Sequence, residues 1–477
     1  MNSVVLPVLL PLLAGLLFSV WQSGTPWRQR SAIVIGLIQV MLTSWFVWMT
    51  YQAPPAMLTL GGWTTPFGIG LVIDHLAALL IATASSITLA VLGYSRLRQP
   101  VQLPLVYFML AGVILSFITG DFFNLFVAFE IMLMASYSLM AASVPASALK
   151  HMYTYLILNI IGSALFLSAT GLVYRLFGTL NFSDLSQFIG TDSRSSVIAI
   201  LVILVYGLKA GVIFYWLPAS YTALPPAIAA LFAGLLTKVG VYALIRVLGV
   251  LIGTATLPLT VLYYASIIIM ILGMLLAIGQ RHIQMILSYN LISHVGFMIL
   301  GIALYNPLGL TGTLYYMLHH MLSITALFLI AGIMQAETQT PDTYKMGHLM
   351  AKRPGLTLLF GIQALGLIGM PPFSGFWGKW LLLTASIATG NIFAVTGLII
   401  ATVLTLYSMI MIFFNAFYAE PDNIASPNQA PKTQWPAYAS VIGLTVLTVG
   451  LGIGSFIGVP SSAYAVDQIR DFSVYIK

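Results

Sequence analysis

Long apolar segments recur along almost the whole chain, separated by short polar connections. An α-helix needs about 20 apolar residues to cross the hydrocarbon core of a bilayer. The runs are continuously apolar and do not alternate with a period of two, which favours helices over the strands of a membrane barrel. We therefore predict an all-α polytopic membrane protein with 14 spans, near residues 3–21, 31–51, 71–95, 103–119, 122–143, 153–175, 196–217, 225–248, 257–279, 283–304, 312–333, 355–389, 391–419 and 436–459.

The connections between these segments are too short to hold a soluble domain. We expect residues 1–477 to form a single integral membrane domain. One connection, residues 178–194, has a pattern of its own, because Phe182, Leu185, Phe188 and Ile189 share helical spacing. This spacing predicts a short helix that lies in the membrane interface.

Composition supports the membrane assignment and excludes several classes of protein. The chain has 18 Lys and Arg, 11 Asp and Glu, and 60% apolar residues. A soluble enzyme, a nucleic-acid-binding protein or a disordered protein could not hide this much apolar surface from water. The chain has no cysteine, which excludes disulfides, Fe–S clusters and thiolate metal sites. We expect no cofactor, no metal and no nucleic-acid partner.

Basic residues gather in alternate connections, and this asymmetry predicts orientation. Connections rich in Lys and Arg usually face the cytoplasm. The side expected to be cytoplasmic carries ten: Arg28, Arg30, Arg96, Arg98, Lys150, Arg281, Lys345, Lys352, Arg353 and Lys432. The opposite side carries five: Arg175, Arg194, Arg246, Arg470 and Lys477. Both termini are then predicted to lie outside the cell.

Four charged residues fall deep inside predicted spans, away from the span ends: Glu130, Lys209, Lys238 and Lys379. Each costs at least about 2.5 kcal/mol at membrane depth, so such residues usually serve function. A structural Glu130–Lys209 ion pair is one interpretation, but it leaves Lys238 and Lys379 without an acidic partner in any span. The other is a proton relay, since burial favours the neutral form of a lysine and a nearby carboxylate favours the charged form.

Three histidines also fall well inside spans, away from the span ends: His294, His319 and His320. Thr311, Tyr315, His319 and Ser323 recur every four residues and form one polar stripe on a helix. The stripe suits either a hydrated proton wire or a packed interhelical hydrogen-bond seam. For His294 alone we favour packing. Haem ligation is disfavoured, because no two spans carry well-matched histidine pairs.

The predicted span 355–389 is too long for one straight helix, which would measure about 52 Å. Its middle carries Gly369, Pro371, Pro372 and Gly375, which predict a break. A discontinuous helix at depth is tolerated beside a water-filled cavity or buried in protein. A similar interruption follows Lys209, at Pro218, Pro225 and Pro226.

Broken helices in both halves of the chain are typical of inverted-repeat transporters. Glu130 and Lys209 would then correspond to His294 and Lys379, since the two pairs are separated by similar distances along the chain.

Three strings resemble motifs of a known family: residues 120–133 (GDFFNLFVAFEIML), 235–242 (LLTKVGVY) and 371–379 (PPFSGFWGK). They resemble the fifth, eighth and twelfth helices of the antiporter-like subunits of NADH:quinone oxidoreductase (complex I), membrane-bound hydrogenases and Mrp cation/proton antiporters. Within that family the chain resembles the D-type branch of the Mrp Na⁺/H⁺ antiporters. Lys379, Phe232 in place of a frequent histidine, and the short tail after residue 459 favour that branch.

The resemblance implies a fold of two inverted five-helix repeats. Residues 1–102 would form the first three helices. Residues 103–248 would form the first repeat (helices 4–8), and residues 257–419 the second repeat (helices 9–13). Residues 436–459 would form the last helix, and the seventh and twelfth helices would be discontinuous.

The resemblance also implies roles for the buried residues. Glu130 would bias the proton affinity of Lys209, and Lys238 would be the central relay group. His319 or His320 would pass the charge onward, and Lys379 would be the gate.

The same resemblance implies a protein that works inside a hetero-oligomer with other Mrp subunits in the plasma membrane. That complex exchanges cytoplasmic Na⁺ for external H⁺, driven by the proton gradient. The chain carries no acidic cluster suited to dehydrated Na⁺, so we expect H⁺ to pass here and Na⁺ to pass through a neighbouring subunit. Two alternatives stay open: the proton-pumping subunit of a redox complex, and a fourteen-span drug exporter.

Overall fold

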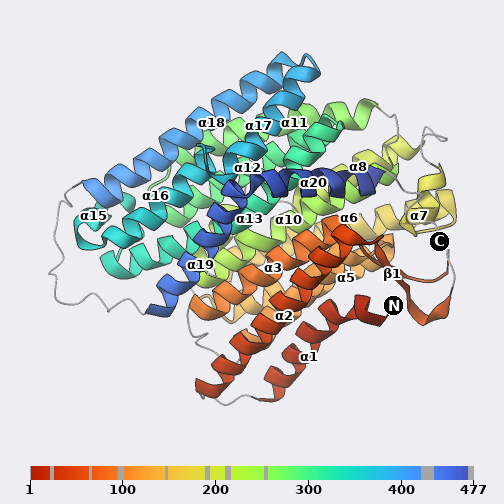
Figure 1. The fold of residues 1–477 in the computed structure, drawn as a ribbon, viewed down its shortest axis with the longest axis horizontal. Helices are drawn as coiled ribbons and strands as arrows, with labels where there is room; N and C mark the ends of the chain where they lie inside the picture. Colours follow the sequence, from red (N-terminus) through yellow and green to blue (C-terminus); the bar gives the residue numbers. More distant parts are fainter. Residues whose placement is uncertain are drawn as a thin grey trace.

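The computed structural model describes residues 2–21, 26–63, 67–94, 101–145, 149–188, 194–209, 216–251, 256–419 and 435–470. Nearly all of these residues are helical, and the long helices pack side by side into one bundle (Figure 1). The all-α expectation is therefore confirmed. The long helices are α1 (Leu6–Val20), α2 (Pro26–Gln52), α3 (His75–Tyr94), α4 (Gln102–Ile118), α5 (Phe122–Ala141), α6 (Leu149–Phe177), α8 (Arg194–Lys209), α10 (Pro226–Leu251), α11 (Thr256–Ile278), α12 (Ile283–Ala303), α13 (Pro307–Thr338), α16 (Pro354–Ile368), α17 (Ser374–Ala388), α18 (Ile392–Ile412), α19 (Trp435–Ile453) and α20 (Ser455–Arg470).

Eleven helices in the described part of the chain are long and apolar enough to cross a membrane. Three shorter apolar helical stretches accompany them, at Gln102–Ile118, Ile198–Gly207 and Pro354–Ile368. These stretches fall where three further spans are predicted. The count of fourteen spans stays a prediction.

The helices form a buried centre and an outer layer. The most apolar stretches of α10 and α13 are buried on every side, and α12 is almost as deeply buried. By contrast, a third or fewer of the residues in the most apolar stretches of α2, α6 and α19 are buried. A helix that is apolar all round belongs inside a protein or inside a membrane. Lys238, His294, His319 and His320 thus lie on the three innermost helices.

The helix predicted over residues 355–389 is broken, as expected. α16 ends at Ile368 and α17 begins at Ser374, so Pro371 and Pro372 lie in the interruption. Gly375 was expected in the break as well, but it is the second residue of α17. Its role there is close packing, described below.

The interruption in the first half differs in part from the expectation. Pro218 lies in the first turn of the short helix α9 (Trp216–Ala223), where a proline is tolerated because its missing N–H has no partner in the helix. The described interruption is at Leu224 and Pro225, and Pro226 begins α10. Residues 210–215, which join α8 to α9, lie outside the described residues.

Two further features were not predicted. Residues 71–73 continue the apolar run of the third predicted span, yet they form strand β2 (Gly70–Ile73). It pairs antiparallel with β1 (Ala56–Thr59), with Ala56 opposite Ile73. The helix α3 begins only after Asp74, whose carboxylate accepts a hydrogen bond from the Ala77 N–H at 2.8 Å. α20 follows α19 and packs against α3, α13 and α17.

The amphipathic helix expected in the 178–194 connection is short. It comprises α7 (Phe182–Leu185) and a 3₁₀ turn (Ser186–Phe188). Phe182 and Leu185 are buried, whereas Phe188 is exposed. Ile189 lies outside the described residues.

The same local pattern occurs in both halves of the chain, at one constant offset in residue number. Isolated backbone bridges join Asp121 to Asn181 and His282 to Asp342. Each bridge is followed at once by a one-turn helix, α7 in the first half and α14 (Thr343–Met346) in the second. α5 and α12 begin directly after Asp121 and His282 and therefore share this offset.

The helix packing repeats at the same offset. A Cβ added at Gly112 would lie 2.5 Å from the Met132 amide nitrogen, and one added at Gly273 would lie 2.8 Å from the Ser293 amide nitrogen. Glycine at these positions lets α4 approach α5, and α11 approach α12, backbone to backbone. At this offset Glu130 corresponds to Leu291, so the pairing of Glu130 with His294 expected from the sequence differs from the structural correspondence.

Candidate functional site

Lys238 lies near the middle of α10 and is fully buried. Its Nζ donates a hydrogen bond to the Ala233 carbonyl of the same helix at 2.6 Å. Within the described residues no ion pair joins Lys238 to a carboxylate. The ammonium group therefore depends on a backbone carbonyl for its hydrogen bond.

Lys379 lies on α17 and is 8% exposed. Its Nζ donates to the Ile368 carbonyl at 3.0 Å, and it lies 4.8 Å from the centre of the Phe297 ring. Ile368 is the last residue of α16, and the final carbonyls of a helix have no partner inside that helix. The helix break thus creates an acceptor for a buried ammonium group, and the Phe297 ring adds a cation–π contact.

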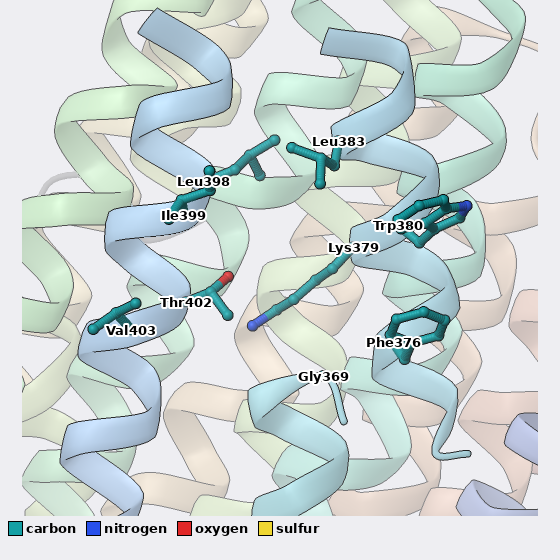
Figure 2. Close-up of a pocket in the computed structure, with 9 residues that line it drawn as sticks. All are labelled: Gly369, Phe376, Lys379, Trp380, Leu383, Leu398, Ile399, Thr402 and Val403. Atoms are coloured by element: carbon teal, nitrogen blue, oxygen red, sulfur yellow. The ribbon is translucent and has the colours of Figure 1, made fainter. Parts of the chain in front are cut away.

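A cavity of about 220 Å³ opens beside Lys379, between α17 and α18. Figure 2 shows the Lys379 side chain reaching from α17 toward α18, with Thr402 and Gly369 beside it. Except for Lys379 and the Thr402 hydroxyl, the lining is apolar or aromatic. The lining residues are Gly369, Phe376, Lys379, Trp380, Leu383, Leu398, Ile399, Thr402 and Val403. This space leaves room for the lysine side chain to change position.

His294 and His320 form a buried cluster with Tyr316 between α12 and α13. The two histidine rings are 5.2 Å apart between centroids. The Tyr316 hydroxyl and His294 Nδ1 share a hydrogen bond of 2.6 Å. His294 Nε2 and both ring nitrogens of His320 have no hydrogen-bond partner among the described residues. Buried polar atoms of this kind usually bind ordered water.

The cluster continues toward Lys379 on one side and toward the helix break on the other. The His294 and Phe297 rings are 5.4 Å apart, and Phe297 also contacts the Lys379 ammonium. His319 Nδ1 lies 2.7 Å from the Ser374 hydroxyl at the start of α17. Sequence reasoning favoured a packing role for His294, and the structure places it in contact with Tyr316, His320 and Phe297, so its role stays a prediction. Only contacts between helices, invisible in one sequence, reveal this position.

The polar stripe predicted on residues 311–323 lies on α13 and faces α16, α17 and α19. The Tyr315 hydroxyl donates to the Leu451 carbonyl at 2.6 Å, and the Ser323 hydroxyl to the Gln363 carbonyl at 3.5 Å. Thr311 bonds to the Pro307 carbonyl of its own helix. These bonds fit the packed interhelical hydrogen-bond stripe, which is one of the two interpretations that the spacing allows. His320 lies beside His294 and is no part of this stripe.

Glu130 is half-buried on α5. The Ser163 hydroxyl of α6 donates to Glu130 Oε1 at 2.5 Å. Lys209 is the last residue of α8, but its side chain lies outside the described residues. The predicted Glu130–Lys209 pair therefore stays a prediction.

A buried ion pair joins Arg246 of α10 to Asp74 at the start of α3. Arg246 Nε also donates to the Tyr242 hydroxyl at 3.0 Å. Arg246 was counted as a loop residue in the charge asymmetry, and this is wrong, because it is 6% exposed. Arg28 is also buried and donates to the Phe18 carbonyl at 2.9 Å. Without these two residues the loop asymmetry is nine against four.

Comparison with known proteins gives consistent matches over the whole chain. Residues 119–405 match the model of the NADH:quinone oxidoreductase/Mrp antiporter transmembrane family. The Na(+)/H(+) antiporter D subunit of Alkalihalophilus pseudofirmus is 35% identical, covering 100% of this chain and 99% of that relative. The Bacillus subtilis protein of the same name is 35% identical over 94% of each chain. A chain in the solved Mrp complex from Dietzia sp. DQ12-45-1b superposes with a TM-score of 0.92, at 27% identity over 100% of this chain and 99% of that one.

Proposed function

Because this chain belongs to the NADH:quinone oxidoreductase/Mrp antiporter family, we propose that it is the D subunit of a multisubunit Na⁺/H⁺ antiporter. It is then a transporter component and not an enzyme, and its partners are the other Mrp subunits and the surrounding lipid. The names of its relatives from Alkalihalophilus pseudofirmus and Bacillus subtilis support this assignment. We propose the plasma membrane as its location.

Within that complex we propose that the chain carries protons along a buried relay. In this relay Glu130 biases the proton affinity of Lys209, Lys238 is the central group, His319 or His320 passes the charge onward, and Lys379 is the gate. One observation supports this proposal above all. Lys238 and Lys379 are both buried and donate hydrogen bonds to helix carbonyls, and neither forms an ion pair with a carboxylate among the described residues. A lysine held in this way can lose its proton without leaving a charged partner behind.

We propose that His294 also belongs to this relay. It lies between Tyr316 and His320 and shares the Phe297 ring with Lys379. The unpartnered nitrogens of His294 and His320 supply sites for the waters that a proton wire needs.

We further propose that the fold contains two inverted five-helix repeats, over residues 103–248 and 257–419. The bridges, one-turn helices and glycine contacts that recur at one constant offset support this division. We also propose a corresponding break in each half; residues 210–215, which join α8 to α9, lie outside the described residues.

We propose that Na⁺ passes through a neighbouring subunit. In the described part of the chain no group of three or more His, Asp or Glu side chains could hold a metal ion. A dehydrated Na⁺ needs several oxygen ligands, and the buried charges near the relay are mainly positive.

The decisive experiment measures antiport per assembled complex in membrane vesicles from a host that lacks its own antiporters. We expect Lys238→Arg and Lys379→Arg to assemble and to lose antiport, because arginine stays protonated, with a pKa above about 12. Arg30→Lys, a change on the exposed surface of α2, is the matched control and should keep full activity. Near-normal turnover in both arginine variants would mean that fixed positive charge suffices and that no proton relay passes through these lysines.

A further inference from the structure

A further buried group of the first half lies on α9, the short helix that precedes α10. This group is Tyr221, whose ring packs against Phe232 of α10 and Phe328 of α13.

Tyr221 is buried and its hydroxyl has no hydrogen-bond partner among the described residues. A buried hydroxyl without a partner costs free energy. The two rings that pack against Tyr221 are both phenylalanines, Phe232 at 6.1 Å and Phe328 at 6.3 Å between centroids. A phenylalanine at this position would pack equally well, so packing does not explain the Tyr221 hydroxyl group.

The surroundings of Tyr221 connect the two parts of the relay. Phe232 of α10 also contacts Tyr155, at 6.3 Å between ring centroids. The Tyr155 hydroxyl in turn shares a 2.8 Å hydrogen bond with Ser136, which lies on α5, the helix of Glu130. On the other side, the Lys238 ammonium bonds to Ala233, the residue next to Phe232.

We propose that the Tyr221 hydroxyl is a proton-relay group that connects the Glu130 side of the first half to Lys238, through water that it binds. Phe232 cannot carry a proton, whereas a hydroxyl both donates and accepts a hydrogen bond. The inference rests on the proposed relay function.

The test compares tyrosine-to-phenylalanine changes at two buried positions. Tyr221→Phe keeps the ring and removes the hydroxyl, and we expect antiport per assembled complex to fall by roughly tenfold or more, as loss of a proton-transfer group does. Tyr107→Phe is the matched control, because Tyr107 is equally buried and its hydroxyl donates to the Ala32 carbonyl at 2.5 Å. That variant should keep its antiport per assembled complex.

A rescue variant separates relay from packing. Phe232→His places an imidazole on the ring position next to Tyr221, and added to Tyr221→Phe it should restore at least part of the antiport. A purely structural role for the hydroxyl predicts normal antiport in Tyr221→Phe and no gain from the histidine. Either result would overturn the inference.

Lys238→Arg in the same vesicles distinguishes this inference from the proposed function. If Lys238→Arg is inactive while Tyr221→Phe is fully active, only the assignment of Tyr221 fails. If Lys238→Arg is active, the relay itself fails, whatever Tyr221→Phe does.

Discussion

Lys238 and Lys379 share a chemical arrangement that a structural ion pair does not require. Each ammonium group is buried and donates to a carbonyl of the helical backbone. A permanently charged lysine at this depth would be stabilised best by a nearby carboxylate. A carbonyl accepts a hydrogen bond and provides no countercharge, so it leaves the lysine able to change its protonation state. This arrangement suits transient protonation.

Glu130→Ala is expected to lose most antiport while the complex still assembles. The carboxylate is half-buried and accepts a hydrogen bond from Ser163, and it is the one carboxylate predicted to lie at membrane depth, so its removal takes away the acidic group of the proposed relay. Glu130→Asp should keep partial activity, because the charge remains and is displaced by one methylene. The measurement is antiport per assembled complex in vesicles.

The double variant Glu130→Gln with Lys209→Met distinguishes transport from pairing. Removing one member of a buried ion pair costs more than removing both, because a lone buried charge is the expensive state. Two relay groups predict an inactive double variant even where assembly is normal. Recovery of antiport in the double variant would favour the structural pair.

The buried lysines and Glu130 could be found from the sequence because charge in an apolar segment is conspicuous on its own. His294 was also noticed in a span, but its contacts with Tyr316 and His320 could not be predicted, because they depend on which side chains of α12 and α13 face each other. Tyr221 could not be found, because its contacts with Phe232 and Phe328 depend on how α9, α10 and α13 pack together.

The break between α16 and α17 brings the backbone of one segment against the other. A Cβ at Gly375 would overlap the Gly366 carbonyl oxygen and lie 2.8 Å from His319 Nε2. Glycine is therefore needed at this position for contact and not for an unusual backbone conformation. The same contact holds His319 beside Ser374. The close approach of α17 to α16 therefore also determines the position of the His319 ring.

Gly375→Ala is expected to push α17 away from α16 and His319. Overpacking of this kind costs roughly 1–3 kcal/mol, and we expect lower thermal stability of the purified complex and strongly reduced antiport. Gly361→Ala on α16 is the matched control, because nothing lies within 4 Å of the added Cβ. It should keep antiport and leave stability unchanged or slightly raised, since alanine favours helix. Equal behaviour of the two variants would contradict the packing argument.

Helices were predicted well from apolar length and proline positions, and their ends less well. Leu71, Val72 and Ile73 extend an apolar run, but they pair with β1 because Asp74 starts α3 with its capping hydrogen bond. α20 was missed because it is less apolar than a span and includes Pro460. Its conformation is supported by packing against α3 and α13, and tertiary contacts of this kind are absent from a local pattern.

Arg281 and Arg353 lie at the same end of the helix bundle. At one end the Thr343 amide donates to the Arg281 carbonyl at 2.9 Å, and Arg353 pairs with Glu337 at 3.0 Å. At the other end lie the β1–β2 pair and α7, opposite α15 (Leu349–Lys352) in Figure 1. The end that carries Arg281 and Arg353 belongs to the side predicted to face the cytoplasm. With Arg28 and Arg246 buried, the asymmetry of nine against four still favours this orientation.

Cysteine labelling tests this orientation in a chain that has no cysteine of its own. Lys352 and Trp63 are both exposed and lie on the sides predicted to be cytoplasmic and external, respectively. In intact cells an impermeant thiol reagent should label Trp63→Cys and leave Lys352→Cys unlabelled, whereas in lysed cells it should label both. The reverse pattern in intact cells would place the α15 end outside.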